Sequence, residues 1–158
     1  MGAEGPTHVI GVEARGYIIG APLAVALNIP FVAARVTKRF PSSFIPEDES
    51  LGYLPMSRSI RNDSIPPRSR VIIVDDFIGT GNTMLAALRI TDIVAAKVVE
   101  VLTVCDVASL QGIVKIRRSD DGIFGETPIF SLIHFNLSPQ EAIEQLEFVN
   151  THLTRSRL

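Results

Sequence analysis

One short segment constrains the fold of this chain more than any other: an apolar, mostly β-branched run that ends in two carboxylates. Residues 70–76 read RVIIVDD, and a Gly- and Thr-rich stretch, FIGTGNT, follows at 77–83. An apolar run without polar alternation is typical of a strand that is buried on both faces, as in a parallel sheet. Because parallel neighbours need crossover connections that are usually helices, the run predicts an α/β fold with this strand near the centre of the sheet.

The rest of the chain alternates in the same way between strand-like and helix-like stretches. Ser138, Pro139 and Glu141 have the spacing of a capping box with proline at the first helical position, which predicts where the last helix begins. No linker or internal repeat divides the 158 residues, so residues 1–158 are expected to form a single domain with a mainly parallel open sheet flanked by helices. The sequence predicts strands at 7–12, 31–36, 70–76, 97–108 and 128–135, and helices at 16–27, 83–96 and 138–153.

Two stretches show no periodicity. Residues 38–59 hold three prolines and charges of both signs, and a structureless segment of this length is usually functional or disordered. We expect a mobile loop at 38–59. Residues 117–127 contain an Asp-Gly pair and predict an ordinary surface turn.

The composition excludes several classes of protein. Hydrophobic residues make up 46% of the chain, which argues against a disordered or fibrous protein. The formal net charge of −2 provides no field that would attract nucleic acid. No apolar run approaches the ~20 residues of a membrane span, and the opening residues lack the basic and apolar regions of a signal peptide. The single cysteine, Cys105, excludes a disulfide framework. We therefore expect a cytoplasmic protein that binds neither nucleic acid nor membranes.

The segment 70–83 also carries the strongest chemical signal. In an open α/β sheet, ligands bind beyond the carboxyl ends of the strands, where Asp75 and Asp76 are expected to lie. The following residues 79–83 can wrap a loop whose backbone N–H groups point at an anion at the start of a helix. A phosphate cradle beside two carboxylates suits a phosphorylated sugar. A strand followed by an ordinary capped turn uses the same residue types, and it is the alternative for this segment.

The segment 71–83 closely resembles the phosphoribosyl pyrophosphate (PRPP) binding signature of the type I phosphoribosyltransferases. The departure is Asn82, where the family usually has a second glycine. Asparagine tolerates left-handed backbone conformations better than most residues, so we expect the loop to survive this change.

Other segments sharpen the resemblance. VIGVEARGYIIGAPLA at 9–24 resembles the Glu-Ala-Arg-Gly-aromatic segment of adenine phosphoribosyltransferases, and FVAARVTKRFP at 31–41 is similar to the stretch that follows it there. Residues 105–112 and 128–135 resemble the C-terminal part of the same family. The resemblance therefore spans most of the chain.

By this resemblance the chain transfers the ribose 5-phosphate of PRPP to a purine base, with adenine as the first expectation, and releases pyrophosphate. Asp75 and Asp76 are then the catalytic carboxylates, beside a ribose that passes through an oxocarbenium-like state. The resemblance further implies Mg²⁺ carried by PRPP rather than held by protein ligands, and a homodimer. The residues that would bind PRPP or its phosphates are Arg15, Gly16, Arg35, Arg39, Gly79, Thr80, Gly81, Asn82 and Thr83.

Two departures from the family concern the base. Adenine phosphoribosyltransferases usually carry several dozen residues before the Glu-Ala-Arg-Gly strand, and these form a hood that holds the base. Here that strand starts close to Met1, so we expect the hood to be absent or reduced. The family also has a Ser-Leu-Glu-Tyr-like stretch, in which this chain has Gly52 in place of the glutamate. The alternatives are a catalytically impaired module that binds PRPP or a nucleotide for regulation, and a mainly structural subunit that dimerises with a complete enzyme.

Overall fold

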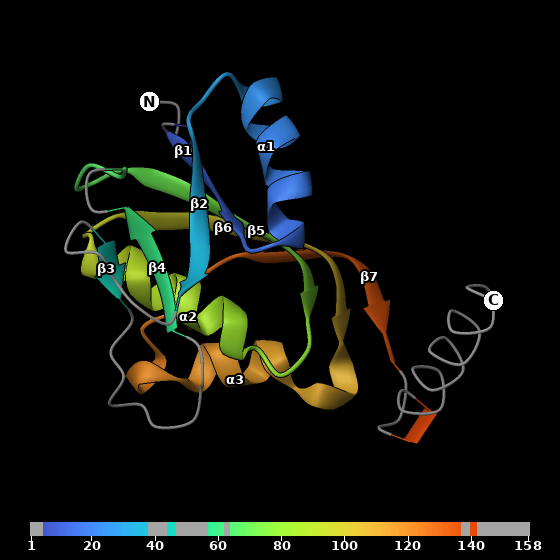
Figure 1. The fold of residues 1–158 in the computed structure, drawn as a ribbon. Coiled ribbons are helices and arrows are strands. Elements are labelled where there is room, and N and C mark those ends of the chain that lie inside the picture. The colour runs from blue at the N-terminus through green and yellow to red at the C-terminus, as the bar shows by residue number, and fades with distance from the viewer. Residues whose placement is uncertain (1–4, 38–43, 47–56, 62–63, 137–139, 142–158) are drawn as a thin grey trace.

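The computed structural model describes residues 5–37, 44–46, 57–61, 64–136 and 140–141 (Figure 1). Within this part of the chain, one sheet has the strand order β3-β4-β2-β1-β5-β6-β7. Its strands are β1 (His8–Val12), β2 (Phe31–Thr37), β3 (Phe44–Pro46), β4 (Ser57–Arg61), β5 (Arg70–Ile78), β6 (Lys97–Val107) and β7 (Ile129–Phe135). The helices are α1 (Arg15–Leu27), α2 (Asn82–Ile93) and α3 (Gly112–Arg118), with single 3₁₀ turns at Ala108–Leu110 and Asp120–Gly122.

The strands β2, β1, β5, β6 and β7 are parallel to their neighbours, whereas β3 and β4 add an antiparallel edge beside β2. Strand β5 lies in the middle of the parallel part, between β1 and β6. The expected fold class, a mainly parallel open sheet flanked by helices, is confirmed.

The two faces of β5 explain why its sequence lacks polar alternation. Val71 and Ile73 belong to a core cluster that includes side chains of α2, whereas Ile72 and Val74 belong to a second cluster that includes side chains of α1. Figure 1 shows α1 on one face of the sheet and α2 with α3 on the other. Burying an aliphatic side chain of this size stabilises the fold by roughly 1.5–3 kcal/mol. Both layers of helices therefore depend on this one strand.

Two expectations about local structure are wrong, and one short helix was not predicted. Strand β5 continues past Asp76 to Ile78, because the long strand β6 offers partners as far as Asp106. Helix α3 was not expected, since its seven residues begin with glycine and are too few for a clear helical period; it is anchored by Ile116, whose exposure is 0%. Parts of 38–59 form β3 and β4, because the edge of β2 accepts an antiparallel partner.

The remaining strands and the first two helices lie within a few residues of their expected positions. The other residues of the expected loop, among them Arg39 and Gly52, lie outside the described residues. The same holds for most of the helix expected at 138–153, of which residues 140–141 are helical.

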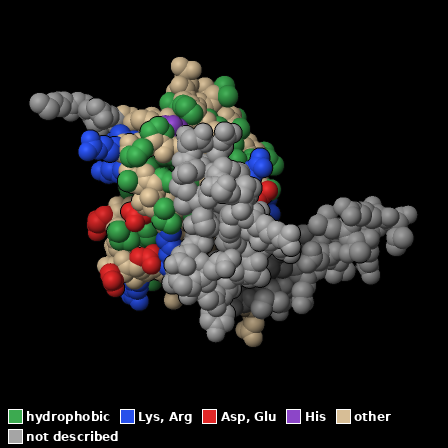
Figure 2. Space-filling model, turned by 60° about the vertical axis from the view of Figure 1, so that its left-hand side comes forward, with side chains coloured by type: hydrophobic (Ala, Val, Ile, Leu, Met, Phe, Trp, Pro, Cys, Tyr) green, Lys and Arg blue, Asp and Glu red, His purple; other side chains and the backbone are tan. Residues whose placement is uncertain are grey.

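The surface carries mixed charges. Figure 2 shows Lys and Arg as well as Asp and Glu side chains on the described part of one face. Among the helices of the described residues, none has the length and apolar character needed to cross a membrane.

Candidate functional site

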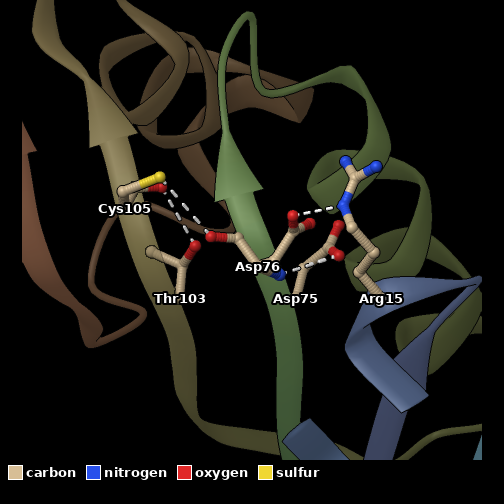
Figure 3. Close-up of polar contacts among 5 residues, drawn as sticks. All are labelled: Arg15, Asp75, Asp76, Thr103 and Cys105. Atoms are coloured by element: carbon tan, nitrogen blue, oxygen red, sulfur yellow. Dashed lines mark hydrogen bonds and ion pairs between the residues drawn. The ribbon is translucent and has the colours of Figure 1, made fainter. Parts of the chain in front are cut away.

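The candidate site lies at the carboxyl edge of the sheet, where β1 leads into α1 and β5 leads into α2. Arg15 is the first residue of α1, and its Nε donates a hydrogen bond to the carboxylate of Asp76 on β5 (Figure 3). The hydrogen bond and the negative charge of Asp76 raise the pKa of the Arg15 guanidinium above its ordinary value. Sequence positions 61 residues apart are thus joined into one charged pair.

The two carboxylates differ in accessibility. Asp75 is 6% exposed, and its Oδ1 accepts a hydrogen bond of 2.9 Å from the backbone N–H of Asp76. The side chain of Asp76 is 27% exposed and that of Arg15 is 71% exposed. Of the three side chains Arg15, Asp75 and Asp76, those of Arg15 and Asp76 are therefore the more accessible to a ligand.

Gly16 explains how the start of α1 reaches β5. A Cβ atom at this position would lie 2.4 Å from the carbonyl oxygen of Val74, the residue before Asp75. Any side chain would therefore push the first turn of α1 away from the strand. Glycine at this position keeps Arg15 beside Asp76.

Arg35 lies near the carboxyl end of β2, with its side chain exposed to solvent. The preceding residue, Ala34, accepts a hydrogen bond of 3.1 Å from the hydroxyl of Tyr17 in the first turn of α1. The ring of Tyr17 also packs edge-on against Phe31, with 5.9 Å between ring centroids. These contacts bring the end of β2 to the same edge as Arg15.

The loop after β5 leads directly into α2. Gly81 has a φ of +81° and caps the helix, and its carbonyl accepts the first helical bond, 2.9 Å from the N–H of Leu85. Asn82 is already the first residue of α2, and the left-handed conformation in the loop belongs to Gly81, so the tolerance of asparagine for that conformation is not needed here. A cavity of about 250 Å³ is lined by residues 77–84 and Leu110.

Two residues of α3, Gly112 and Lys115, contact this loop and the start of α2, and the sequence did not predict either contact. A Cβ atom on Gly112 would lie 2.2 Å from the carbonyl oxygen of Gly79 and 2.8 Å from the backbone nitrogen of Gly81. One turn later, Lys115 donates a hydrogen bond from Nζ to Oδ1 of Asn82. Gly112 is the last residue of segment 105–112, which resembles the family. That resemblance is the sequence feature from which the contact of Gly112 with the loop could have been anticipated.

Cys105 lies on β6 behind the carboxylates, with its Sγ 3.7 Å from the carbonyl oxygen of Asp76. Burial, reinforced by the charges of Asp76 and Asp106, raises the pKa of this thiol. A thiol is nucleophilic only when deprotonated. The raised pKa therefore makes Cys105 a poor nucleophile, although it lies close to the carboxylates.

Other polar groups do not extend the site. His134, on β7, contacts the carboxylate of Asp106 through Nδ1. A larger cavity of about 500 Å³, lined among others by Arg70, Asp92 and Lys97, lies at the amino ends of β5 and β6, opposite the edge where α/β proteins bind ligands. Among the described residues, no group of three or more His, Cys, Asp or Glu side chains is placed to hold a metal ion.

The chain matches a known family over most of its length. A family model described as the phosphoribosyl transferase domain matches residues 2–141. Adenine phosphoribosyltransferase 1 of Triticum aestivum is 39% identical over 127 residues, which cover 80% of this chain and 66% of the relative. An adenine phosphoribosyltransferase of Neisseria meningitidis is 37% identical over 125 residues, covering 79% of this chain and 63% of the relative. The chain thus spans less than two thirds of these relatives.

Solved structures give the same result. The adenine phosphoribosyltransferase of Trypanosoma brucei, determined in complex with AMP, pyrophosphate and ribose-5-phosphate, has a TM-score of 0.74 and 30% identity, over 82% of this chain and 56% of that one. The enzyme of Leishmania tarentolae also has a TM-score of 0.74, with 31% identity over 82% of this chain and 62% of its own. The family model, which matches residues 2–141, includes every described residue of the candidate site.

Proposed function

This chain belongs to the phosphoribosyl transferase domain family, and we propose that it transfers the ribose 5-phosphate of PRPP to a purine base, adenine, and releases pyrophosphate. The observation that carries this proposal is the Arg15–Asp76 pair beside the loop that opens α2. PRPP has three parts: pyrophosphate, ribose and the 5′-phosphate. The cation, the two carboxylates and the anion-binding helix start, which lie at one sheet edge, match these parts in that order. The relatives named as adenine phosphoribosyltransferases support adenine as the base, and they give no support to a regulatory binding module.

The loop 79–83 would bind the 5′-phosphate. The first backbone N–H groups of α2 lie at the positive end of the helix dipole, where anions are stabilised. Thr80 and Thr83 add hydroxyl groups in the same short segment. Together these groups position the sugar relative to the carboxylates of β5.

Arg15 and Arg35 would bind the pyrophosphate. The contact of Arg15 with Asp76 uses Nε, which leaves the two terminal amino groups of the guanidinium for phosphate oxygens. Asp76 thereby holds the guanidinium plane in place before the ligand arrives. Arg39, expected to act with them, lies outside the described residues.

Asp75 and Asp76 would act on the ribose. A carboxylate accepts hydrogen bonds from sugar hydroxyls, and its negative charge stabilises the positive charge that develops on the ring as the bond to pyrophosphate breaks. Asp76 is the more accessible of the two, and buried Asp75 supports it through the backbone N–H between them.

Mg²⁺ fits this arrangement as a companion of PRPP. Magnesium in such sites is bound by one or two carboxylates together with substrate phosphates, rather than by a cage of protein ligands. PRPP itself would carry the ion on its phosphate and ribose oxygens, and the carboxylates of Asp75 and Asp76 would lie close to it. When bound, the ion would offset negative charge on the departing pyrophosphate.

We also propose that residues 1–158 form one domain, that it acts in the cytoplasm, and that it pairs with a second copy. Helix α1 has no charged residue after Arg15, and Ile18 and Val25 on its surface are 75% and 81% exposed. A helix that is apolar on all sides is usually buried. We expect the parent to sediment as a dimer and Val25→Glu as a monomer, because the substitution places a charge in the interface. A parent that sediments as a monomer would contradict the homodimer.

The central proposal is tested by binding and by product formation. PRPP with Mg²⁺ should raise the melting temperature, because a ligand that binds only the folded state stabilises it by about 2.7 kcal/mol at a hundredfold excess over Kd. Incubation of PRPP with adenine should yield AMP and pyrophosphate, detected by chromatography, with guanine, hypoxanthine and uracil as competing bases.

The two readouts separate the alternatives. Stabilisation by PRPP without any nucleotide product would favour the regulatory module. An unchanged melting curve at millimolar PRPP and Mg²⁺ would contradict the site itself.

A further inference from the structure

The loop that would bind the 5′-phosphate contains no basic residue: positions 77–84 read FIGTGNTM. Backbone N–H groups and a helix dipole supply only partial charges against a phosphate that carries nearly two negative charges. Hydrogen bonds from a Lys or Arg side chain to phosphate are charge-assisted and roughly twice as strong as neutral ones. Any full positive charge at this loop would therefore have to come from a residue elsewhere in the chain.

Helix α3 places such a charge next to the loop. The helix begins at Gly112, which packs against the backbone of Gly79 and Gly81. Lys115 follows on the same helix, and its Nζ donates a hydrogen bond to Oδ1 of Asn82, the first residue of α2. The ammonium group is thereby held at the start of α2, the helix whose first N–H groups would face a bound phosphate.

From this geometry we infer that Lys115 is a phosphate-binding residue of this protein, held in position by Asn82. An ammonium group has three donors, and the contact with Asn82 uses one of them. The exposed side chain can direct the others at phosphate oxygens without breaking that contact. The inference rests on the proposed function, because it assigns Lys115 to the 5′-phosphate of PRPP or AMP.

The contact with Lys115 gives a role to Asn82, the residue that stands where the family signature usually has a second glycine. A glycine at position 82 has no side chain that could hold Lys115, whereas the amide of Asn82 accepts its hydrogen bond. The side chain of Lys115 is long and flexible, and confining it before the ligand binds lowers the entropy cost of binding. Asn82 is in this sense a positioning residue for Lys115.

The test compares AMP with adenosine, which lacks the phosphate, by isothermal titration calorimetry on the full chain. Lys115→Met is expected to weaken AMP binding by about 10- to 100-fold, the range of a hydrogen bond to a charged group, and to leave adenosine binding unchanged. Lys115→Arg should restore most of the AMP affinity, because it keeps the charge. Lys97→Met is the matched control: it removes an exposed lysine at the opposite edge of the sheet and should bind AMP like the parent.

Asn82→Gly tests the positioning role. It should weaken AMP binding less than Lys115→Met does, and Lys115→Met should cost less in the Asn82→Gly background than in the parent, since coupled residues are not additive. A parent that binds AMP while Lys115→Met binds it equally well would overturn this inference and leave the proposed function intact. A parent that binds neither AMP nor PRPP would overturn the proposed function, and the inference with it.

Discussion

Replacing Asp76 with asparagine is expected to lower kcat/KM for PRPP by about 10²- to 10³-fold, the usual loss when one preorganised electrostatic group is removed from an active site. The substitution keeps the shape of the side chain but removes the negative charge that, on the proposed function, would face the ribose. It also removes the charge that holds the Arg15 guanidinium. Steady-state kinetics with adenine and PRPP would measure the effect, and the melting temperature without ligand would show whether the fold is intact.

A matched control is available on the same chain. Asp92→Asn makes the same chemical change at an exposed position near the end of α2, close to the opposite edge of the sheet, and should leave kcat/KM unchanged. Arg15→Gln should impair turnover as well, and the double variant with Asp76→Asn should lose less than the sum of the two, because the residues act as a pair. Full activity in Asp76→Asn would assign the carboxylate a structural role only.

Replacing Gly112 with alanine is expected to have the second large effect. The new Cβ atom would meet backbone atoms of Gly79 and Gly81 at 2.2 Å and 2.8 Å, so either the loop or α3 must move. Overpacking of this kind costs about 1–3 kcal/mol of folding stability. A displacement of about 1 Å in a substrate-positioning group can lower the rate by 10²-fold. We expect both a lower melting temperature and a marked loss of PRPP binding.

Calorimetry and thermal unfolding would measure the two effects together. Gly5→Ala is the control, since a Cβ atom there has no neighbour within 4 Å. If Gly112→Ala binds PRPP like the parent, the contact between α3 and the loop does not determine the geometry of the cradle. A loss of stability without a loss of binding would give Gly112 a role in folding alone.

The local chemistry of the sequence was sufficient to predict the parallel core. The apolar side chains of 70–76 point to both faces of the strand, so they can be buried only between two layers of helices. The structure has α1 and α2 on opposite sides of β5. The same reasoning located Asp75 and Asp76 near a carboxyl edge, although pairing with β6 carries the strand on to Ile78. These features depend on side chains that lie close together in the sequence.

Edge strands and short helices were less predictable. Strands β3 and β4 have no strong hydrophobic period of their own, and they form because β2 leaves an edge with unpaired backbone groups. Helix α3 is too short to be stable alone. It depends on the buried side chain of Ile116 and on the close contact of Gly112 with the loop.

The sequence by itself determined which residue types are available for the candidate site: two carboxylates, a glycine-rich turn at a helix start, and arginines near the ends of two other strands. Only the tertiary structure decided how they are combined. It paired Arg15 with Asp76, gave the left-handed position of the loop to Gly81 rather than Asn82, and brought Lys115 to Asn82. The physical reason is that these contacts join residues far apart in the chain, and their distances are set by the packing of α1 and α3 against the sheet and the loop, which no local pattern records.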